Sequence, residues 1–572
     1  MTRSKARIVG SSVLALGVLI LFSLPLVAAD NPQPVLGHVV AFGVTPPLRD
    51  LAKLPQPPHY GFHEANPVRM IPKRSFEHVM DPAEQRGALP SAEFNLVYHV
   101  LGVGNGFPNY SVPDAPPDTT MAVGDWPGND ANSQFVQWVN VSYAVFNKAT
   151  GVALTGAIEG NSLWQSLNGN PLCKSQNDGD IIAKFDRQAH RWFLTQNVFS
   201  SPYAVCIAVS TSPDATGTYY VYQFNVPGNG FPDYPKWGIW STGGASDGYF
   251  QAVNNFGPGG SGFQGPQICG YDRAKLLVGD QTAEQICYQL TSGEDSLLPA
   301  DRDSPTPPPS TEAEFYIGSV ADVDNSHLSV YSFQINNWAT GDATITGRGN
   351  SQLVAVAAYN GSCSGQYGGD CVPQLGTASE VDSLGDRLMY RFAYWEDRPP
   401  SNTAAATPLP APVQHWFVNG DVESSTGQIG VRWYEFTAPL RTVPVTTLAV
   451  FQQGTYAGVP GDTNYRWMGS LTRDNTYDIL LGYSESSANM YPSLAVAGRM
   501  YTDPLGTLST ENLYVAGTGS QPSTANRWGD YSTMAIDPSD NCTFYYTQEY
   551  YMVTQQFDWS TDVSKWKFPT CQ

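Results

Sequence analysis

Asp118-Thr-Thr-Met-Ala-Val-Gly124 and Asp180-Ile-Ile-Ala-Lys-Phe-Asp186 are the first two of a series of similar phrases in this chain of 572 residues. Each begins with a polar residue, continues as a short run typical of a β-strand, and is followed by turn residues and further strand-like runs. The remaining phrases are Asp233-Tyr-Pro-Lys-Trp-Gly-Ile-Trp240, Asp386-Arg-Leu-Met-Tyr-Arg391, Tyr465-Arg-Trp-Met-Gly-Ser470 and Arg527-Trp-Gly-Asp-Tyr-Ser532. A spacing of roughly 50 to 80 residues indicates a repeated structural unit.

Short strands and turns repeated at this spacing predict an all-β protein, a β-propeller whose blades are antiparallel meanders. We place blade openings near residues 118, 180, 233, 315, 382, 465 and 527. This gives seven blades, with six as the alternative, because the fourth opening, Phe315-Tyr-Ile-Gly-Ser319, lacks the acidic residue. The Pro-rich stretch from Leu297 to Thr311 is predicted to be a loop between blades.

The composition agrees with this architecture. Only 14% of the residues are charged, 12% are aromatic, and the chain contains 54 Gly and 44 Pro, which favours turns and strands over helical faces. The near-identical phrases Gly104-Asn-Gly-Phe-Pro-Asn-Tyr110 and Gly228-Asn-Gly-Phe-Pro-Asp-Tyr234 add a second internal repeat.

The N-terminal residues predict export. Arg3, Lys5 and Arg7 precede an apolar run from Ile8 to Leu24, and the small residues Val27-Ala-Ala29 offer a cleavage site for a signal peptidase. The alternative is an N-terminal membrane anchor, because the run is nearly long enough to span a bilayer. With the signal removed, we expect no membrane span and a secreted protein, extracellular or periplasmic.

The domain organisation follows from a change of pattern near residue 95. The segment before it is Pro-rich and is predicted to be an extended lead-in that packs on the domain, with a separate pro-segment as the alternative. We expect the strand-like Phe94-Asn-Leu-Val-Tyr-His-Val100 to complete the last blade, because strands from both termini would then remove an exposed edge. The predicted parts are a signal peptide (1–29), the N-terminal lead-in (30–94) and the propeller (95–572).

The charge balance disfavours nucleic acid as a partner. Removal of the signal takes away three of the 30 Lys and Arg, which leaves 27 against 51 Asp and Glu, a net charge of 27 − 51 = −24. Nucleic acid is bound mainly by clustered Lys and Arg, and the sequence contains no basic run of that kind. We expect a monomer whose acidic surface serves solubility.

All eight cysteines follow the predicted signal, and their even number in an exported chain predicts disulfides. Eight cysteines allow 105 connectivities, and we favour pairing between nearest neighbours. The pairs are then Cys173 with Cys206, Cys269 with Cys287, Cys363 with Cys371, and Cys542 with Cys571. None of the spacings is CxxC, which disfavours zinc binding and thiol redox chemistry.

Candidate functional residues lie at the openings of the predicted inner strands, which surround the mouth of a propeller's channel. Carboxylates and cations that converge there would serve glycosidic acid/base chemistry or recognition of a charged sugar. The alternative is structural, with Asp and Arg from adjacent blades paired to hold the ring together. The candidate substrate-binding residues are Asp233, Lys236, Asp386, Arg387, Arg466, Trp467, Arg527 and Trp528.

Beyond this reasoning, the chain resembles the secreted bacterial β-propellers of the BNR-repeat, sialidase-like kind. It is most similar to uncharacterised exported proteins that share Val136-Gln-Trp-Val-Asn140, Asp233-Tyr-Pro-Lys236 and Arg527-Trp-Gly-Asp-Tyr-Ser532. The resemblance covers roughly residues 95 to 572, and its phrases mark a fold more than an activity. Ser212-Pro-Asp-Ala-Thr-Gly-Thr-Tyr219 resembles the Asp-box of that family with one inserted residue, and implies a hairpin turn.

The resemblance also implies roles for particular residues. Sialidases of this architecture bind a carboxylate with three arginines and use a tyrosine paired with an acidic residue as nucleophile. The matching arginines here would be Arg387, Arg466 and Arg527. The candidate catalytic residues are Asp118, Asp180, Asp530 and Tyr531. The family's Arg-Ile-Pro phrase in the first blade is missing, which places the sialidase reaction itself in doubt.

We therefore carry two functional hypotheses. The first is an exported propeller that recognises, and in its catalytic form hydrolyses, an extracellular glycan or related polymer through its axial funnel. The second is a non-catalytic surface or adhesion module. No cofactor is required, but calcium is a candidate for three oxygen-rich turns, whose alternative use is to cap backbone groups. These turns are Asp178-Gly-Asp180, Asp322-Val-Asp-Asn325 and Asp537-Pro-Ser-Asp540.

Overall fold

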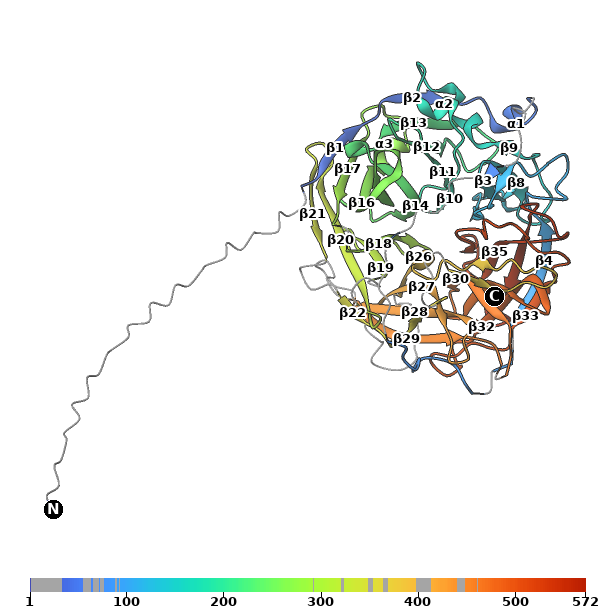
Figure 1. Cartoon of the computed structure of the whole chain (residues 1–572). Helices are drawn as coiled ribbons and strands as arrows, with labels where there is room; N and C mark the ends of the chain where they lie inside the picture. The colour runs from blue at the N-terminus through green and yellow to red at the C-terminus, as the bar shows by residue number, and fades with distance from the viewer. Residues whose placement is uncertain are drawn as a thin grey trace, which may run out of the picture.

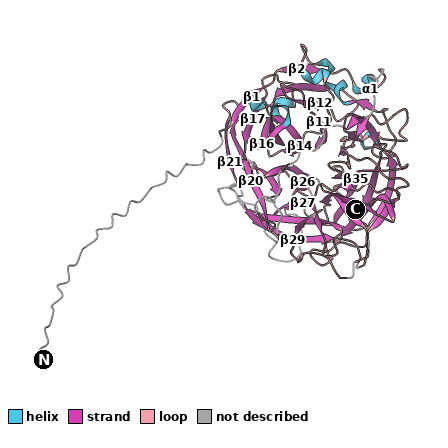
Figure 2. Cartoon of the chain, viewed as in Figure 1, coloured by secondary structure: helices cyan, strands magenta, loops and turns pink. Residues whose placement is uncertain are grey.

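The structure is a computed structural model. It describes residue 1 and residues 33–54, 63–64, 71, 77–87, 90–91, 93–291, 293–319, 324–347, 353–363, 369–397, 413–439, 448–459 and 461–571. Strands dominate the described residues and the helices are short (Figure 2), which confirms the all-β prediction. Apart from residue 1, the predicted signal peptide lies outside the described residues.

Most strands belong to antiparallel meanders that follow one another along the chain. The first meander comprises β6 (Thr120–Val123), β7 (Gln134–Val139), β8 (Ser142–Asn147) and β9 (Ile158–Glu159). The second comprises β10 (Ile182–Asp186), β11 (Arg191–Val198), β12 (Ala204–Ser210), β13 (Tyr219–Asn225) and, added at its edge, β2 (Ala41–Val44). The third comprises β14 (Phe231–Trp240), β15 (Gly248–Gly257), β16 (Ser261–Asp272), β17 (Glu284–Gln289) and, at its edge, β1 (Val35–His38).

A ten-stranded sheet contains the next two meanders. One holds β18 (Asp295–Arg302), β19 (Glu314–Ser319), β20 (His327–Asn337), β21 (Asp342–Thr346) and β22 (Leu353–Ala355). The other holds β26 (Leu388–Asp397), β27 (Val413–Glu423), β28 (Ile429–Pro439), β29 (Ala449–Tyr456) and β23 (Asn360–Gly361). They are joined by a parallel pair between β18 and β26, in which Ala300 lies opposite Phe392.

Two further sheets complete the series. The first comprises β30 (Tyr465–Arg473), β31 (Ile479–Ser487), β32 (Met490–Arg499) and β33 (Asn512–Val515). The second comprises β34 (Thr533–Ile536), β35 (Thr543–Tyr550), β36 (Ser560–Lys567) and β4 (Asn95–Leu101). Small two-stranded pairs are β3 (His63–Glu64) with β5 (Asp114–Ala115), and β24 (Asp370–Val372) with β25 (Val381–Asp382). The helices are α1 (Leu48–Leu51), α2 (Leu172–Ser175), α3 (Arg273–Leu276), η1 (Asp130–Asn132), η2 (Gly160–Ser166), η3 (Pro227–Asn229) and η4 (Pro258–Gly260).

The meanders are arranged around a ring (Figure 1). The first strand of each meander contacts the first strand of the next, in the order β6, β10, β14, β18, β26, β30 and β34. β34 contacts β6 again, so these inner strands form a closed circle around an axis. The blade count itself stays a prediction.

Strands near the N-terminus cover outer edges of the ring. β4 pairs antiparallel with β36, with Val100 opposite Val563, which confirms that a strand near residue 95 completes the last meander. β1 pairs with β17, and β2 pairs with β13. Paired edges cannot recruit another chain, so these additions protect the ring from edge-to-edge association. The predicted boundary between residues 30–94 and 95–572 stays a prediction.

The strands are buried on both faces because neighbouring sheets stack against each other. All nine residues of β31 are buried, although the strand contains three serines and a glutamate. Large aromatic side chains fill the spaces between sheets. Trp138 and Trp192 share one hydrophobic core between the first two meanders, and Trp395 and Trp433 share another core with residues of β31 and β35.

The structure corrects the predicted opening of the fourth meander. Phe315 lies in β19, the second strand, and the inner strand is β18, part of which was predicted to be a loop. β18 ends in Ala300-Asp301-Arg302 and contains Pro299, so its sequence has turn residues and charges where a strand pattern is sought. Those charges are tolerated because they face partners across the axis, which local sequence cannot show.

The four predicted disulfides are confirmed. Cys173 is bonded to Cys206, Cys269 to Cys287, Cys363 to Cys371, and Cys542 to Cys571. Disulfides of this number are typical of proteins that fold in an oxidising compartment.

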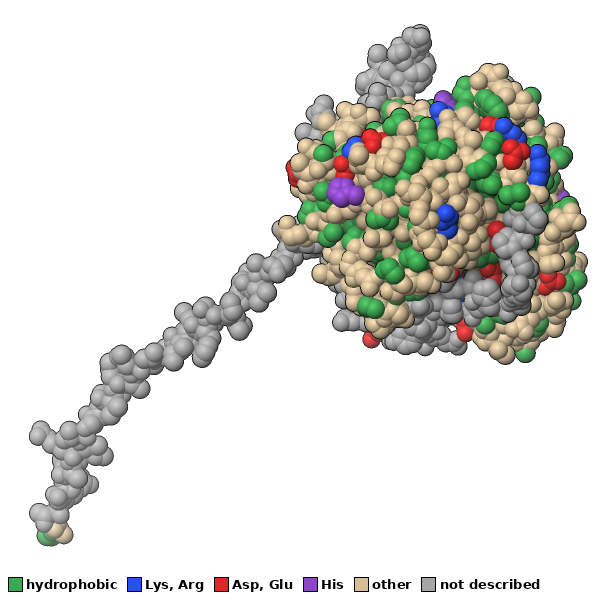
Figure 3. All heavy atoms as spheres, turned by 90° about the horizontal axis from the view of Figure 1, so that it is seen from above, with side chains coloured by type: hydrophobic (Ala, Val, Ile, Leu, Met, Phe, Trp, Pro, Cys, Tyr) green, Lys and Arg blue, Asp and Glu red, His purple; other side chains and the backbone are tan. Residues whose placement is uncertain are grey.

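On the face shown in Figure 3, charged side chains of both signs are scattered among neutral and apolar groups. Among the described residues, no helix has the length and apolar character needed to cross a bilayer.

Stability should depend on pH through His415, which lies in β27 between two carboxylates. His415 Nε2 is 2.9 Å from Asp397 Oδ2, and Nδ1 is 2.6 Å from Glu435 Oε1. Burial opposes the charged imidazolium, but its hydrogen bonds to the carboxylates of Asp397 and Glu435 outweigh burial and the nearby Arg473, and raise the pKa of His415 above 6.5. A group whose pKa is higher in the folded than in the unfolded state stabilises the folded protein. The full contribution is present below the unfolded-state pKa, and it is lost as the pH rises through the folded-state pKa.

We therefore expect His415→Asn to lower the free energy of unfolding by about 2 kcal/mol at pH 5.5 and by less at pH 8.5. Urea denaturation at both pH values measures the difference. His78→Asn is the control, because His78 is largely exposed and lies 3.8 Å from Glu423. An equal loss at both pH values for His415→Asn would contradict the assignment of a charged imidazolium.

Candidate functional site

Several inner strands share the same irregularity where they approach the axis. The pairing register shifts between Asp233 and Lys236 in β14, Asp295 and Leu298 in β18, Met389 and Ala393 in β26, and Trp467 and Ser470 in β30. The φ angle is positive at a non-glycine residue near the inner ends of several strands: Asp118 (45°), Asp180 (49°), Tyr234 (54°), Ser296 (51°) and Met468 (56°). Bulges of this kind redirect side chains out of the sheet. Here they direct polar side chains from successive strands toward the axis.

The structure brings most of the predicted site residues together at this level. We call the group the axial cluster: Asp118, Asp180, Tyr234, Lys236, Arg387, Arg527, Asp530 and Tyr531. The Asp530 backbone N–H donates to Asp118 Oδ1 at 2.7 Å, and the Tyr234 backbone N–H donates to Asp180 Oδ2 at 3.2 Å. The Tyr234 hydroxyl donates to the Asp530 carbonyl oxygen at 3.2 Å. These bonds link the first, second, third and last meanders of the ring.

Lys236 lies at the centre of the axial cluster. Its Nζ atom is 3.3 Å from the centre of the Tyr234 ring and 4.0 Å from the centre of the Tyr531 ring. The side chain is fully buried, and Nζ donates to the Pro235 carbonyl oxygen at 3.1 Å. Two aromatic faces therefore stabilise a cation that has little access to water.

Burial shifts the titration of this cluster toward neutral groups. It raises the pKa of Asp118, and the nearby Asp530 and Asp180 carboxylates add to the shift. Burial raises the pKa of Asp180, and the carboxylate of Asp233 adds to the shift. Burial lowers the pKa of Lys236, although Asp180 opposes the shift. Buried ionisable groups with perturbed pKa values mark candidate functional sites, and also occur in structural networks.

The two arginines of the cluster have acidic partners. Arg387 Nε donates to Asp386 Oδ1 at 2.7 Å, and its guanidinium lies 4.7 Å from the centre of the Tyr234 ring. Arg527 pairs with Asp530. Both guanidinium groups are therefore held by carboxylates of their own meander.

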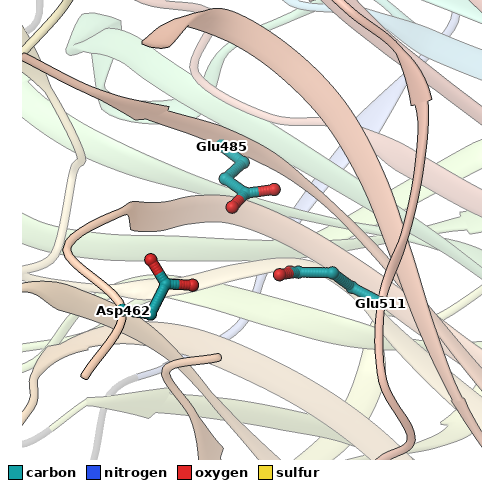
Figure 4. Close-up of side chains that lie close together, drawn as sticks. All are labelled: Asp462, Glu485 and Glu511. Carbon is teal, nitrogen blue, oxygen red and sulfur yellow. The ribbon is translucent and has the colours of Figure 1, made fainter. Parts of the chain in front are cut away.

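Arg466 does not join them. The carboxylates of Asp462, Glu485 and Glu511 point toward one another (Figure 4), with oxygens within 4.8 Å. A cluster of this spacing is compatible with a metal ion, but the guanidinium of Arg466 lies within bonding distance of all three, at 2.9 Å from Glu485 and 2.6 Å from Glu511. Arg466 supplies the cation for this acidic group. The predicted convergence of Arg387, Arg466 and Arg527 is therefore wrong for Arg466.

The two predicted tryptophans lie in the core. Trp467 and Trp528 are almost fully buried, and their ring centres are 5.4 Å apart. Trp528 also contacts Tyr551 at 5.7 Å and donates a hydrogen bond to Ser484 Oγ at 3.2 Å. Their predicted role in stacking on sugars is untested, and both rings contribute to packing.

In the three turns considered as calcium sites, the carboxylates accept backbone N–H groups or pair with a lysine. Asp178 accepts the Phe199 N–H at 2.8 Å, and Asp324 accepts the Ser326 N–H at 2.7 Å. Asp540 accepts the Thr543 N–H at 3.0 Å, while Asp537 pairs with Lys148 at 2.8 Å. Asp322 lies outside the described residues. Calcium binding stays a prediction.

A cavity of about 40 Å³ lies on the axis beside the axial cluster, and sequence reasoning missed it. Tyr390 separates the two, because its ring is 6.1 Å from that of Tyr531 and 4.5 Å from Lys184 Nζ. The charged lining residues are Lys184, Arg187, Asp301, Arg302, Asp303 and Arg391. Lys184 and Arg391 lie within the repeated phrases, so the sequence did offer these two residues as candidates. The prediction concentrated instead on the residues at the start of each phrase.

Comparisons with known proteins give only remote likenesses. No family model and no curated protein matches the sequence. The Hadza microbial sialidase Hz136 is 9% identical with a TM-score of 0.29, and the match covers 86% of this chain and 100% of that one. The phage phi92 endosialidase is 8% identical with a TM-score of 0.33, covering 83% and 69%. Drosophila semaphorin 1a, extracellular domains 1-2, is 7% identical with a TM-score of 0.31, covering 82% and 89%. At such scores these likenesses carry no argument about this chain.

Proposed function

We propose that this chain is an exported, seven-bladed β-propeller that binds an extracellular glycan or related polymer at the axis of its ring. The closed circle of inner strands from β6 to β34 supports seven blades. The four disulfides support export to an oxidising compartment.

The observation that carries the proposal is the convergence of the axial cluster. Side chains from separate meanders place Asp118, Asp180, Asp530 and Lys236 around one point. Sugars offer hydroxyl groups to carboxylates and cations, and binding sites favour points where such polar groups converge.

A second candidate function is hydrolysis of the bound glycan. It is favoured by the raised pKa of Asp118 and Asp180, because a glycosidase needs one carboxyl group that holds a proton near neutral pH and one that is ionised. Tyr531, the predicted nucleophile, is fully buried, and its hydroxyl donates to the Ile181 carbonyl oxygen at 3.3 Å.

The test measures binding and product release on a panel of neutral, sialylated and uronic-acid glycans, with the mature protein and Asp530→Ala. Glycan binding by the unaltered protein supports the proposal, and released oligosaccharides that disappear in Asp530→Ala support hydrolysis. Asp562→Ala is the matched control, because Asp562 is an equally buried carboxylate that pairs with His99 away from the axis, at 2.9 Å. The proposal would be refuted if the unaltered protein bound no glycan and both variants had a lowered melting temperature. That result would indicate that the charged residues at the axis serve stability.

A further inference from the structure

The axial cavity is large enough for a small ion. A water molecule needs about 10–15 Å³ of such space, so about 40 Å³ accommodates a few waters or one small oxyanion. Its lining comes from β6, β10, β18, β26 and β34, so the cavity lies where five inner strands meet. No single meander could form it.

The charged lining is unbalanced. It contains four cations, Lys184, Arg187, Arg302 and Arg391, and two carboxylates, Asp301 and Asp303. The carboxylates already have partners. Asp301 Oδ2 lies 2.5 Å from Lys184 Nζ and 2.6 Å from Arg391, and Asp303 binds the other side of Arg391 at 2.5 Å. The guanidinium groups of Arg302 and Arg187 are not part of this pairing.

Arg302 makes its hydrogen bonds to neutral atoms although its side chain is more than nine-tenths buried. It donates to the carbonyl oxygens of Ser304 and Pro305 at 2.9 and 2.8 Å, to Ser241 Oγ at 2.7 Å and to Gln188 Oε1 at 2.8 Å. Burial lowers its pKa to about 10, so it remains charged at neutral pH. Among the described residues, no ion pair to Arg302 is formed.

Arg187 is only half-buried, and it too forms no ion pair among the described residues. Its guanidinium donates to the neutral Asn541 side-chain oxygen, and burial lowers its pKa to about 10. Three carboxylates near these two arginines pair with other basic side chains. Asp186 binds Arg273 at 2.6 Å, Asp537 binds Lys148 at 2.8 Å, and Asp125 binds His190 at 2.7 Å.

We propose that the axial cavity binds a small oxyanion, held directly by Arg187 and Arg302, with the Lys184–Asp301–Arg391 pairs forming its wall. A guanidinium offers N–H groups in a fixed fork that matches carboxylate, sulfate or phosphate oxygens. The same chemistry fits a free inorganic anion and the carboxylate of an acidic sugar. This inference concerns residues outside the axial cluster and does not depend on the glycan proposal.

Isothermal titration calorimetry tests the inference on the mature chain, with inorganic phosphate, sulfate, glucuronate and neutral glucose at constant ionic strength. We expect binding of an oxyanion, no binding of glucose, and a melting temperature that rises by about 2 °C or more at a 100-fold excess over Kd. Stronger binding of glucuronate identifies an acidic sugar as the source. Stronger binding of phosphate or sulfate identifies a free anion.

Arg302→Gln should raise the Kd about tenfold or more, because it removes a charge-assisted hydrogen bond. Arg187→Gln should act in the same direction and serves if Arg302→Gln fails to fold. Arg499→Gln is the control, because Arg499 is also buried and donates to the carbonyl oxygen of Asp503 at 2.8 Å, but does not line the cavity. The inference is overturned if the unaltered protein binds none of the three anions, or if both cavity variants bind them as tightly as Arg499→Gln does.

Discussion

Arg466→Met should lower the free energy of unfolding by about 3 kcal/mol, because it leaves the buried carboxylate of Glu485 and the partly buried carboxylates of Asp462 and Glu511 without their cation. Arg466 is fully buried and bonds to Asp462, Glu485 and Glu511 in one place. Burial already raises the pKa of Glu485, although Arg466 opposes the shift. Without the guanidinium, these carboxylates must take up protons or repel one another. Urea denaturation at pH 7 measures the loss.

The double variant Arg466→Met with Glu511→Gln is the informative partner. It removes one of the repelling charges, so it should be more stable than Arg466→Met alone. Together with the single variant Glu511→Gln, the four proteins give the coupling between the two side chains. The result also discriminates between roles. A variant with unchanged stability that has lost glycan binding would restore the original prediction that Arg466 contacts substrate.

Asp301→Asn should lower the free energy of unfolding by about 3 kcal/mol at pH 7. Asp301 pairs with Lys184 of β10 and Arg391 of β26, and accepts the Ile239 N–H of β14 at 3.2 Å. It therefore connects three meanders around the axis. Burial tends to raise its pKa, but Arg391 and Lys184 outweigh burial and lower it.

A carboxyl group whose pKa is lower in the folded than in the unfolded state stabilises the folded protein. The full contribution is present above the unfolded-state pKa of about 3.9, and it is lost as the pH falls through the folded-state pKa. The difference between the unaltered protein and Asp301→Asn should therefore be larger at pH 5 than at pH 3. Asp50→Asn is the control, since the exposed pair of Asp50 and Lys53 should contribute less than about 1 kcal/mol. A loss for Asp301→Asn no larger than the control's would contradict the role of Asp301 in holding the ring.

Features encoded in short stretches of sequence could be predicted. Disulfides between nearest cysteines, such as Cys173 with Cys206, connect parts of the same meander, so proximity along the chain indicated proximity in space. The all-β class followed from the repeated strands and turns. The strand near Phe94 was recognised because an unpaired edge at the end of the series needed a partner.

Features that depend on contacts across the axis could not be predicted in this way. Local sequence predicts a loop for part of β18 because Asp301 finds its partner Lys184 on β10, and Arg302 bonds to Gln188 in the turn that follows β10. Arg466 was placed at the axis because its phrase resembles those of Arg387 and Arg527. Its position two residues before the bulge at Met468 instead leaves the side chain among Glu485 and Glu511. The cavity could not be predicted because Arg187 and Arg302 come from different meanders and lie outside the repeated phrases.

The pairing of β4 with β36 has a consequence for folding kinetics. Leu101 lies opposite Asp562, so β4 is synthesised long before the strand with which it pairs. Such a long sequence separation raises the contact order, which slows folding and prolongs the life of partly folded species. Until β36 arrives, β4 is a free strand that a protease can cleave or another chain can capture. Closure of the ring should accordingly be the slow step of maturation, and the cell must protect the chain until it is complete.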